Sequence, residues 1–206
     1  MTRTAVVTGG SGGIGSEVVK QLRKANWRVV SLSRREGCDV SDESHVKRAF
    51  SSLDALDALV HCAAVLIKKP LTDVTAGDWD VQLGSNLRGA FLCSREAFRL
   101  MRDRGGAIVF VSSLSGVAGA EKFPGMSAYV AAKSGLAGLT EALSVEGRPL
   151  GIRVNAISPG AVDTPMLRIS GVAGSALKPS EVGRVIVWLA SPESAPVTGG
   201  NLRMDP

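Results

Sequence analysis

The sequence predicts an α/β fold: a doubly wound, mostly parallel sheet of six to seven strands with helices on both faces. Two observations predict it. Short runs rich in β-branched residues alternate from end to end with longer segments whose apolar residues recur at helical spacing. The short runs are apolar on both faces, as strands buried in a parallel sheet are. No linker or repeat interrupts the 206 residues, so we expect one domain over residues 1–206.

The expected strands and helices follow one another in a regular order. Apolar β-branched runs predict strands at Thr4–Thr8, Arg28–Ser33, Ala58–Cys62, Ala107–Val111 and Ile152–Ile157, with a last strand near Asn201–Met204. Apolar residues at helical spacing predict helices over Gly13–Ala25, Asp42–Ser52, Asn86–Arg104 and Ser127–Glu146, and a shorter helix over Ser180–Ala190. Strands and helices that alternate in this way form a layered α/β sandwich.

The segment after the second expected strand is unusually short. Only a few residues separate that strand from Asp39 and Val40, whereas a crossover helix needs about a dozen residues. We therefore expect the third strand to be vestigial or its helix to be missing.

The composition argues against several classes of protein. The net charge is +5, but the basic residues are spread along the chain in nothing larger than pairs such as Arg34-Arg35, so we expect no nucleic-acid binding. The three cysteines have no CxxC spacing, which argues against a metal site and a disulfide framework. No apolar stretch reaches the roughly 18 residues of a membrane span. With free thiols and no signal-peptide pattern, we expect a cytoplasmic protein without membrane contact.

A glycine-rich turn, Thr-Gly-Gly-Ser-Gly-Gly-Ile-Gly over residues 8–15, links the first strand to the first helix. Glycines there let the backbone approach a pyrophosphate, whose charge the free amides and the helix dipole favour. The context is that of a dinucleotide-binding Rossmann fold. The residues expected to contact the dinucleotide in this turn are Gly9, Ser11, Gly13, Ile14 and Gly15.

The end of the second strand bears on which nicotinamide dinucleotide binds. An acidic residue that grips the adenosine ribose is expected about 20 residues after the turn, but Ser33 stands there, followed by Arg34. With no carboxylate to repel a 2′-phosphate and a guanidinium to pair with it, the sequence favours NADP(H) over NAD(H).

Tyr129 is the only tyrosine in the chain, and Lys133 follows on the same expected helix. A spacing of one helical turn places both side chains on one face. An ammonium group about 4 Å from a phenol, at an effective dielectric constant of roughly 20, favours the phenolate by about three pKa units. We therefore expect Lys133 to make Tyr129 acidic enough to act as a general acid or base near neutral pH.

Taken together, these segments resemble the classical short-chain dehydrogenase/reductase (SDR) family over nearly the whole chain. The matching motifs, in order, are Thr8-Gly9-x-x-x-Gly13-Ile14-Gly15, Asp39-Val40, Asn86-Leu87-x-Gly89-x-Phe91, Val111-Ser112-Ser113, Tyr129-x-x-x-Lys133 and Asn155-x-x-x-Pro159-Gly160. The resemblance implies an NAD(P)(H)-dependent oxidoreductase that moves hydride between nicotinamide and a carbonyl or hydroxyl compound.

The resemblance also implies residue roles. Ser113 would hold the carbonyl oxygen, and Tyr129 would give it a proton. Lys133 would bind the nicotinamide ribose, and Asn86 would anchor a water that resupplies the proton. The remaining cofactor contacts it implies are Ser33, Arg34, Asp39, Val40, Ala63, Ala64, Pro159, Gly160, Val162 and Thr164.

The sequence departs from the family pattern at two places near the site. The family's Asn-Asn-Ala-Gly segment is replaced by His-Cys-Ala-Ala over residues 61–64, and we expect His61 to be an ordinary packed histidine. The spacing from Ser113 to Tyr129 is a few residues longer than usual, so Ser112 or Ser115 could take the serine role. Ser113 is favoured because it stands just past the end of a strand.

The substrate side is predicted only in outline. A short loop over about residues 164–180, where the family carries a substrate lid, offers the apolar contacts Met166, Leu167, Ile169, Val172 and Leu177. Phe123, Pro124 and Met126 would form the opposite wall, which suggests a small, moderately apolar carbonyl or alcohol substrate.

Two further expectations concern assembly and turnover. The two long helices look apolar on more than one face, and the family often pairs these helices, so we expect a homodimer or homotetramer. The alternative to an enzyme is a catalytically silent dinucleotide-binding regulator or sensor with the same fold.

Overall fold

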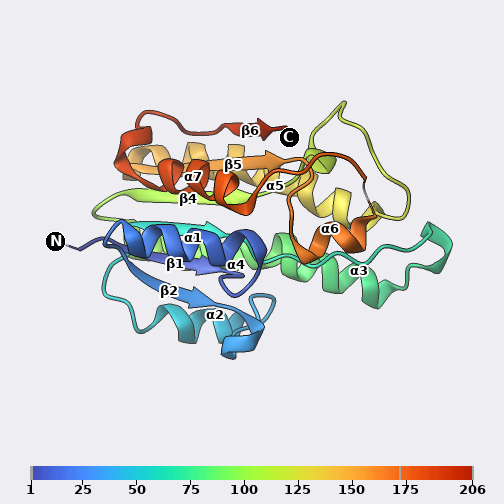
Figure 1. Ribbon diagram of the computed structural model, residues 1–206. Coiled ribbons are helices and arrows are strands. Elements are labelled where there is room, and N and C mark those ends of the chain that lie inside the picture. Colours follow the sequence, from blue (N-terminus) through green and yellow to red (C-terminus); the bar gives the residue numbers. More distant parts are fainter. Residues whose placement is uncertain (1, 172, 206) are drawn as a thin grey trace.

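The computed structural model describes residues 2–171 and 173–205, and it builds one six-stranded sheet in the order β2-β1-β3-β4-β5-β6 (Figure 1). Every neighbouring pair of strands runs parallel. The strands are β1 Thr4–Thr8, β2 Arg28–Leu32, β3 Ala58–His61, β4 Gly106–Val111, β5 Ile152–Pro159 and β6 Asn201–Met204. The predicted parallel sheet of six to seven strands is confirmed.

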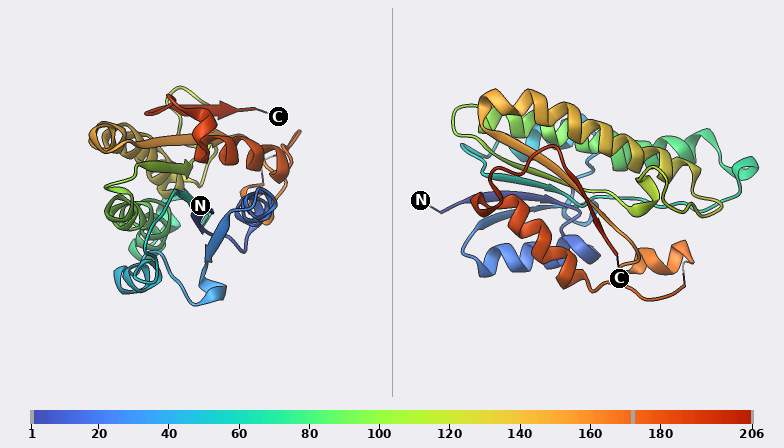
Figure 2. Two further views of the ribbon diagram at one scale, coloured as in Figure 1. Left: turned by 90° about the vertical axis from the view of Figure 1, so that its left-hand side faces the viewer. Right: turned by 90° about the horizontal axis from the view of Figure 1, so that it is seen from above.

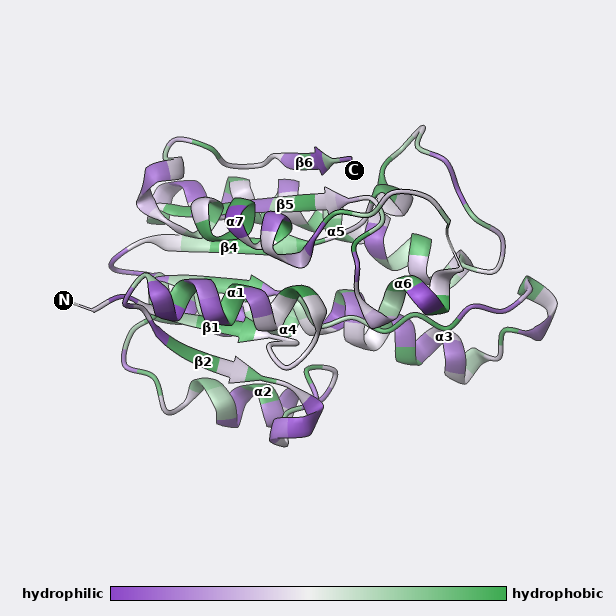
Figure 3. Ribbon diagram, in the orientation of Figure 1, coloured by the Kyte–Doolittle hydropathy of each residue, from purple (hydrophilic) through white to green (hydrophobic). Residues whose placement is uncertain are grey.

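Helices cover both faces of the sheet (Figure 2). On one face lie α1 (Gly13–Lys24) and α7 (Pro179–Ala190), and on the other lie α2 (Glu43–Phe50), α4 (Gly89–Met101) and α5 (Ser127–Gly147). A hydrophobic core lies on each face of the sheet, and alternate residues of a strand point into one core and then the other. Val6 and Leu59 pack on the α2–α4–α5 side, whereas Val7 and Val60 pack on the α1–α7 side. Apolar residues therefore run along the central strands (Figure 3).

Strand β2 forms one edge of the sheet, as the short crossover predicted. After β2 the chain makes a 3-10 turn at Arg34–Glu36 and enters α2, and no described residue pairs with the outer side of β2. The third strand of the usual arrangement is thus missing. Its loss leaves β2 half-exposed, with only Leu32 buried among its five residues.

Two of the described α-helices were not predicted: one before α4, and the short helix α6 (Pro165–Ser170), which lies in the segment expected to be a loop. Before α4 the chain forms α3 (Ala76–Leu83) and a π-helical turn over Gly84–Arg88. The helix that was predicted to begin at Asn86 corresponds to α4. A capping box starts α3: Thr75 accepts a hydrogen bond from the Asp78 amide, and the Asp78 carboxylate accepts one from the Thr75 amide. This signal is readable in the sequence but was missed, because the apolar stripe of α3 is weak.

All six strands end at the same edge of the sheet. Two elements stand beyond that edge: α3 and the short helix α6 (Pro165–Ser170), both at the right of Figure 1. Ligands of open parallel sheets bind outside the carboxyl ends of the strands, so the site is sought there.

Candidate active site

The glycine turn after β1 packs tightly against two other segments. Gly9 has a φ of +65°, and a Cβ on it would lie 2.7 Å from the Ala63 amide nitrogen. A Cβ on Gly13 would lie 2.6 Å from Thr164 Cγ2. Larger residues would push the turn off the segments that follow β3 and β5, so these two positions require glycine.

The residues of this turn fit the phosphates of a dinucleotide. Gly12 caps α1 without a side-chain hydrogen bond, and the first turn of α1 contains no acidic residue. Its first-turn amides therefore have no side-chain acceptor and, with the positive end of the helix dipole, can bind an anion. Ser11 is exposed beside them, Ile14 packs on the core, and Gly15 is buried.

At the end of β2 a carboxylate lies where the sequence analysis expected none. Glu36 accepts hydrogen bonds from the Ser33 hydroxyl at 2.6 Å and from the Ser31 hydroxyl at 3.0 Å. The 3-10 turn Arg34–Glu36 brings this carboxylate back over the strand end, whereas Arg34 is exposed. The expectation of a carboxylate-free strand end is wrong, because it considered only the residue that directly follows the strand.

Asp39 and Val40 lie after this turn, beside the π-helical turn. Burial acts to raise the pKa of Asp39, but hydrogen bonds from Ser41 and the charge of Arg34 lower it overall. Val40 is buried, and its side chain would meet a Cβ on Gly89 at 2.7 Å. The segment is therefore fixed against α4, with the Asp39 carboxylate ionised.

The three candidate serines differ in what they contact. The Ser112 hydroxyl is buried and donates to the Lys133 backbone carbonyl at 2.9 Å. The Ser113 oxygen accepts from the Ser115 amide at 3.2 Å, and its hydrogen bond with Tyr129 acts to lower the pKa of that phenol. Of the three, Ser113 is the one that acts on Tyr129.

Tyr129 is 7% exposed, and its hydroxyl lies 3.9 Å from Met166 Sδ. Burial raises the pKa of Tyr129 to about 12, with the Ser113 hydrogen bond opposing that rise. The predicted lowering of the Tyr129 pKa is therefore wrong in this structure, because the net shift is upward. The Lys133 ammonium stands over the face of the ring, 5.5 Å from its centroid, and is not aimed at the hydroxyl.

Lys133 is 2% exposed and donates to the Val111 carbonyl at 2.7 Å. Burial lowers the pKa of Lys133 to about 8. The lysine therefore carries its charge at neutral pH and loses it in mildly alkaline solution. A Cβ on Gly116 would lie 2.6 Å from the Lys133 carbonyl carbon, so the turn after β4 rests on α5 at this residue.

Asn86 lies in the π-helical turn with both its side-chain groups occupied. Its Oδ1 accepts from the Val65 amide at 2.7 Å, and its Nδ2 donates to the Val65 carbonyl at 2.8 Å. In the same segment the Ala63 amide donates to Thr8 Oγ1 at 3.2 Å, and Ala64 is half-buried beside it. Each side-chain group of Asn86 thus makes one hydrogen bond to the backbone of Val65 and keeps one further donor or acceptor position.

The segment after β5 borders the site next to the glycine turn. Pro159 ends β5, Gly160 follows it, and Val162 forms an isolated bridge with Leu177. Thr164 precedes α6 and reaches the glycine turn at Gly13. The structure thus brings the four segments predicted to contact the cofactor to one edge of the sheet.

An apolar cluster surrounds Tyr129 on the substrate side. Its members are Leu66, Met126 and Tyr129, with Phe123, Val130 and Met166 packed against them. Helix α6, which carries Met166, is tied down by Lys68, whose ammonium donates to the Ser170 carbonyl at 2.6 Å. This contact could not be predicted, because nothing in the local sequence relates Lys68 to residue 170. Of the predicted loop contacts, Val172 lies outside the described residues.

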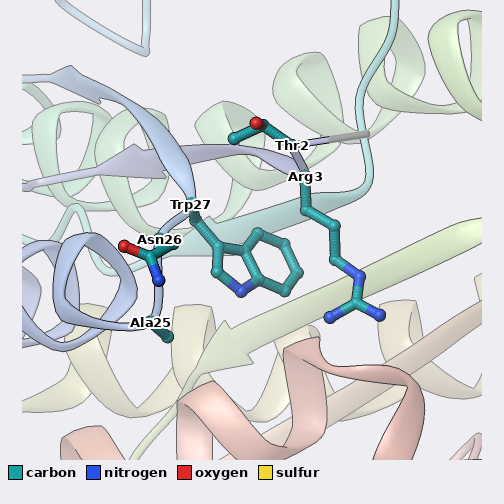
Figure 4. Close-up of a pocket in the computed structure, with 5 residues that line it drawn as sticks. All are labelled: Thr2, Arg3, Ala25, Asn26 and Trp27. Atoms are coloured by element: carbon teal, nitrogen blue, oxygen red, sulfur yellow. The ribbon is translucent and has the colours of Figure 1, made fainter.

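Hollows also occur at the opposite end of the sheet. One, of about 360 Å³, is lined by Thr2, Arg3, Ala25, Asn26 and Trp27, with the Arg3 guanidinium 5.5 Å from the Trp27 ring centroid (Figure 4). These residues stand at the amino end of β1, away from Tyr129, so this hollow is not the active site. Over residues 2–171 and 173–205 no cluster of side chains could hold a metal ion, and no helix there is long and apolar enough to span a membrane.

Comparison with known proteins was made on sequence and on structure. The family model described as enoyl-(acyl carrier protein) reductase matches residues 9–206. A short-chain dehydrogenase/reductase of Armillaria gallica is 32% identical over 249 residues, covering 98% of this chain and 94% of the relative. An acetoacetyl-CoA reductase of Allochromatium vinosum is 32% identical over 240 residues, covering 98% of this chain and 96% of the relative.

Solved structures of other proteins are also similar to this chain. The 3-ketoacyl-(acyl-carrier-protein) reductase from Brucella melitensis, complexed with NADH, has a TM-score of 0.88 and 25% identity over 98% of this chain and 96% of its own. ElxO with NADP bound has a TM-score of 0.88 and 27% identity over 100% of this chain and 98% of its own. The chain therefore belongs to the short-chain dehydrogenase/reductase family and is an NAD(P)-dependent oxidoreductase acting on hydroxyl and carbonyl groups.

Proposed function

We propose that this oxidoreductase interconverts a small, apolar ketone or aldehyde and its alcohol, with Tyr129 as the general acid and base. The observation that carries the proposal is the setting of the Tyr129 hydroxyl. It meets the Ser113 hydroxyl and the Met166 thioether inside an apolar cluster, while Lys133 stands over its ring. No observation favours the alternative of a silent regulator or sensor.

In the direction of reduction the residues divide the work. Ser113 holds the carbonyl oxygen by a hydrogen bond, and Tyr129, protonated because its pKa is about 12, donates a proton to that oxygen. Lys133, charged at neutral pH, stabilises the phenolate left behind. A nicotinamide cofactor, when bound, supplies the hydride. We assign the resupply of the proton to a water held by Asn86.

The cofactor contacts are proposed from the segments that meet at the carboxyl edge of the sheet. The glycine turn binds the pyrophosphate, Asp39 and Val40 flank the adenine, and the alanines 63–64 line the dinucleotide. The residues Pro159, Gly160, Val162 and Thr164 border the nicotinamide. Lys133 binds the adjoining ribose through its ammonium group.

We propose NADP(H) as the favoured cofactor because Arg34 follows β2 with its guanidinium in solvent, where it can pair with a 2′-phosphate. One observation favours NAD(H) instead: the Glu36 carboxylate, held by Ser33 and Ser31, would accept from a ribose hydroxyl and repel a phosphate.

Two variants separate these cofactor preferences. If Arg34 dominates, wild type prefers NADPH, and Arg34→Gln removes the preference. If Glu36 dominates, wild type prefers NADH, and Glu36→Gln moves it toward NADPH. The measurement is the ratio of kcat/KM for the two nucleotides, and wild-type preference for NADH would contradict the proposal of NADP(H).

The surroundings of Tyr129 support the proposed substrate class. The wall of the site is apolar, and its two methionines, Met126 and Met166, can adapt to different shapes. The rim lysines Lys68 and Lys122 donate to backbone carbonyls, which uses part of the donor capacity of each ammonium group. The loop over about residues 164–180 is proposed as the substrate lid of a single domain.

We also propose a homodimer or homotetramer in the cytoplasm. Exposed apolar side chains on the long helices, Phe91 on α4 and Val145 on α5, support self-association. The three free thiols support a reducing compartment.

The function is tested by comparing wild type with Tyr129→Phe. Each is mixed with NADPH or NADH and a panel of ketones, quinones and aldehydes, and loss of nicotinamide absorbance is followed. We expect wild-type turnover and a loss of about 10³-fold or more in the variant. Nucleotide binding, followed as a rise in Tm, should persist in both. Binding without turnover in either protein would point to the silent regulator.

A further inference from the structure

His61, the last residue of β3, is fully buried among elements that build the site. It pairs in register with Thr8 of β1, and its ring meets Phe110 of β4 edge-on, 6.4 Å between centroids. Nothing in the proposed mechanism uses this histidine. It stands under the glycine turn on one side and beside the π-helical turn that carries Asn86 on the other.

The hydrogen bonds around Thr8 leave its hydroxyl proton available to the imidazole. Thr8 Oγ1 accepts from the Ala63 amide at 3.2 Å and lies 2.9 Å from His61 Nδ1. Its oxygen thus receives the Ala63 proton while its own hydroxyl proton is available to Nδ1. Nδ1 is then an acceptor, and a neutral ring carries its proton on Nε2. Burial, together with the charge of Lys133, lowers the pKa of His61 to about 3, which agrees with a neutral ring.

The other ring nitrogen faces the π-helical turn. Nε2 is buried and makes no hydrogen bond of ordinary geometry with a described residue, yet the backbone of Ser85 is close enough to raise the pKa of His61 by hydrogen bonding. Such an effect requires an acceptor, which is the Ser85 carbonyl. In an α-helix the Gly89 amide would bond to that carbonyl, but here it bonds to Gly84. The Gly89 amide is therefore not the partner of the Ser85 carbonyl, and we infer that this carbonyl accepts the Nε2 proton.

We propose that His61 is a positioning residue whose imidazole joins Thr8, beneath the cofactor turn, to Ser85, beside Asn86. The Nδ1 contact holds the Thr8 hydroxyl in the orientation that accepts from Ala63, on whose backbone Gly9 rests. The Nε2 contact holds the π-helical turn at its place beside Lys133. The proposal rests on the proposed roles of the glycine turn and of Asn86.

The two contacts can be removed separately. An asparagine amide reaches the position of Nδ1 and not that of Nε2, and a glutamine amide reaches the position of Nε2. We expect His61→Asn to keep the Kd for the nicotinamide nucleotide within about twofold and to lower kcat about 3- to 10-fold, the loss of one hydrogen bond. We expect His61→Gln to do the reverse, weakening nucleotide binding by a similar factor while kcat stays within about twofold.

Kinetics, titration of nucleotide binding and Tm are measured on the three proteins. Opposite patterns in the two variants support the proposal. Parallel losses of Kd and kcat that follow the loss of Tm would overturn it in favour of simple core packing, and so would no change in either variant.

A second measurement does not depend on turnover. In ¹⁵N imidazole NMR, with His45→Gln to assign the two histidines, His61 should show a proton on Nε2 and no titration between pH 5 and 8. A proton on Nδ1, or titration in that range, would overturn the proposal. If wild type reduces no substrate, the proposed function fails, whereas the NMR result still decides the His61 contacts.

Discussion

Lys133, not Tyr129, is the residue at this site whose charge changes near physiological pH. The pKa of Lys133 is lowered to about 8, so the lysine is charged below pH 8 and neutral above it. Because kcat/KM reports ionisations of the free enzyme, it should hold steady below pH 8 and fall above. Lys133→Arg keeps the charge and should remove this fall. The profile is measured between pH 6 and 10, and a flat wild-type profile would contradict the role given to Lys133.

Ser112 and Ser113 are neighbours with different expected roles. Ser113→Ala removes a donor to the substrate oxygen and should lower kcat about 10²-fold. Ser112→Ala removes the hydrogen bond to the Lys133 carbonyl and should lower the free energy of unfolding by about 1 kcal/mol, with kcat changed much less. Kinetics and urea unfolding of both variants check this. A larger kcat loss in Ser112→Ala would reassign the serine role.

His61 should make the protein sensitive to acid. Its pKa is about 3 when folded and 6.5 ordinarily, so between these pH values the unfolded chain binds a proton that the folded protein excludes. The resulting cost is absent above pH 6.5 and grows as pH falls, by at most about 1.4 kcal/mol per pH unit. Urea unfolding at pH 4.5, 5.5 and 6.5 should give wild type a steeper dependence than His61→Asn. Equal slopes would mean that His61 is not held neutral.

At the residue scale, the sequence predicted which residues form the site but not the contacts that hold their side chains. Ser113, Tyr129 and Lys133 could be identified because motif spacing fixes their places on a strand end and a helix face. The contact of Glu36 with Ser33 could not, because it depends on a side chain that folds back over a turn. The predicted direction of the Tyr129 pKa shift was wrong because burial of the phenol, which a sequence does not show, raises that pKa.

At the scale of elements, two adjacent lysines fix two different helices. Lys68 donates to the Ser170 carbonyl at the end of α6, whereas Lys69 forms an ion pair with Asp78 of α3 at 2.8 Å. We expect Lys68→Met to speed hydrogen exchange of residues 165–171 without affecting α3. Lys69→Met should speed exchange only in α3.

Exchange followed by mass spectrometry on the two variants tests this arrangement. Each variant serves as the control for the other, since both lose one lysine charge from the same loop. Equal effects of both variants on α6 would show that Lys68 does not hold the lid.

The strands and most helices were predictable because periodicity alone identifies them. Helix α3 was missed because its apolar stripe is weak, and the π-helical turn was missed because one extra residue in a helical turn leaves no clear periodic signal. The short segment between Ser33 and Asp39 predicted that the third strand would be vestigial or its crossover helix missing, but which of the two occurs required the structure.

At the scale of the whole molecule, exposed apolar side chains on α4 and α5 favour self-association. Phe91 is 46% exposed and Val145 is 66% exposed, on neighbouring helices of one layer. We expect wild type to behave as a dimer or tetramer in light scattering, and the double variant Phe91→Ser, Val145→Ser to have a lower mass. Leu71→Ser, at an exposed apolar residue outside these helices, is the control. A monomeric wild type would contradict the expectation.

The doubly wound parallel sheet was predicted from the sequence, but the order of its six strands, the partners of each helix and the closeness of α6 to Tyr129 required the structure. The contact between Lys68 and Ser170, for example, joins segments that no local pattern relates.

The central claim is direct hydride transfer at Tyr129, and isotope transfer tests it most directly. A ketone reduced by wild type is incubated with the preferred reduced nicotinamide nucleotide carrying deuterium at the transferable position, and the alcohol is examined by mass spectrometry. We predict one deuterium on the carbinol carbon in wild type and no measurable product with Tyr129→Phe, which still binds the nucleotide. Nucleotide consumption without deuterated alcohol, or undiminished product from Tyr129→Phe, would contradict the claim.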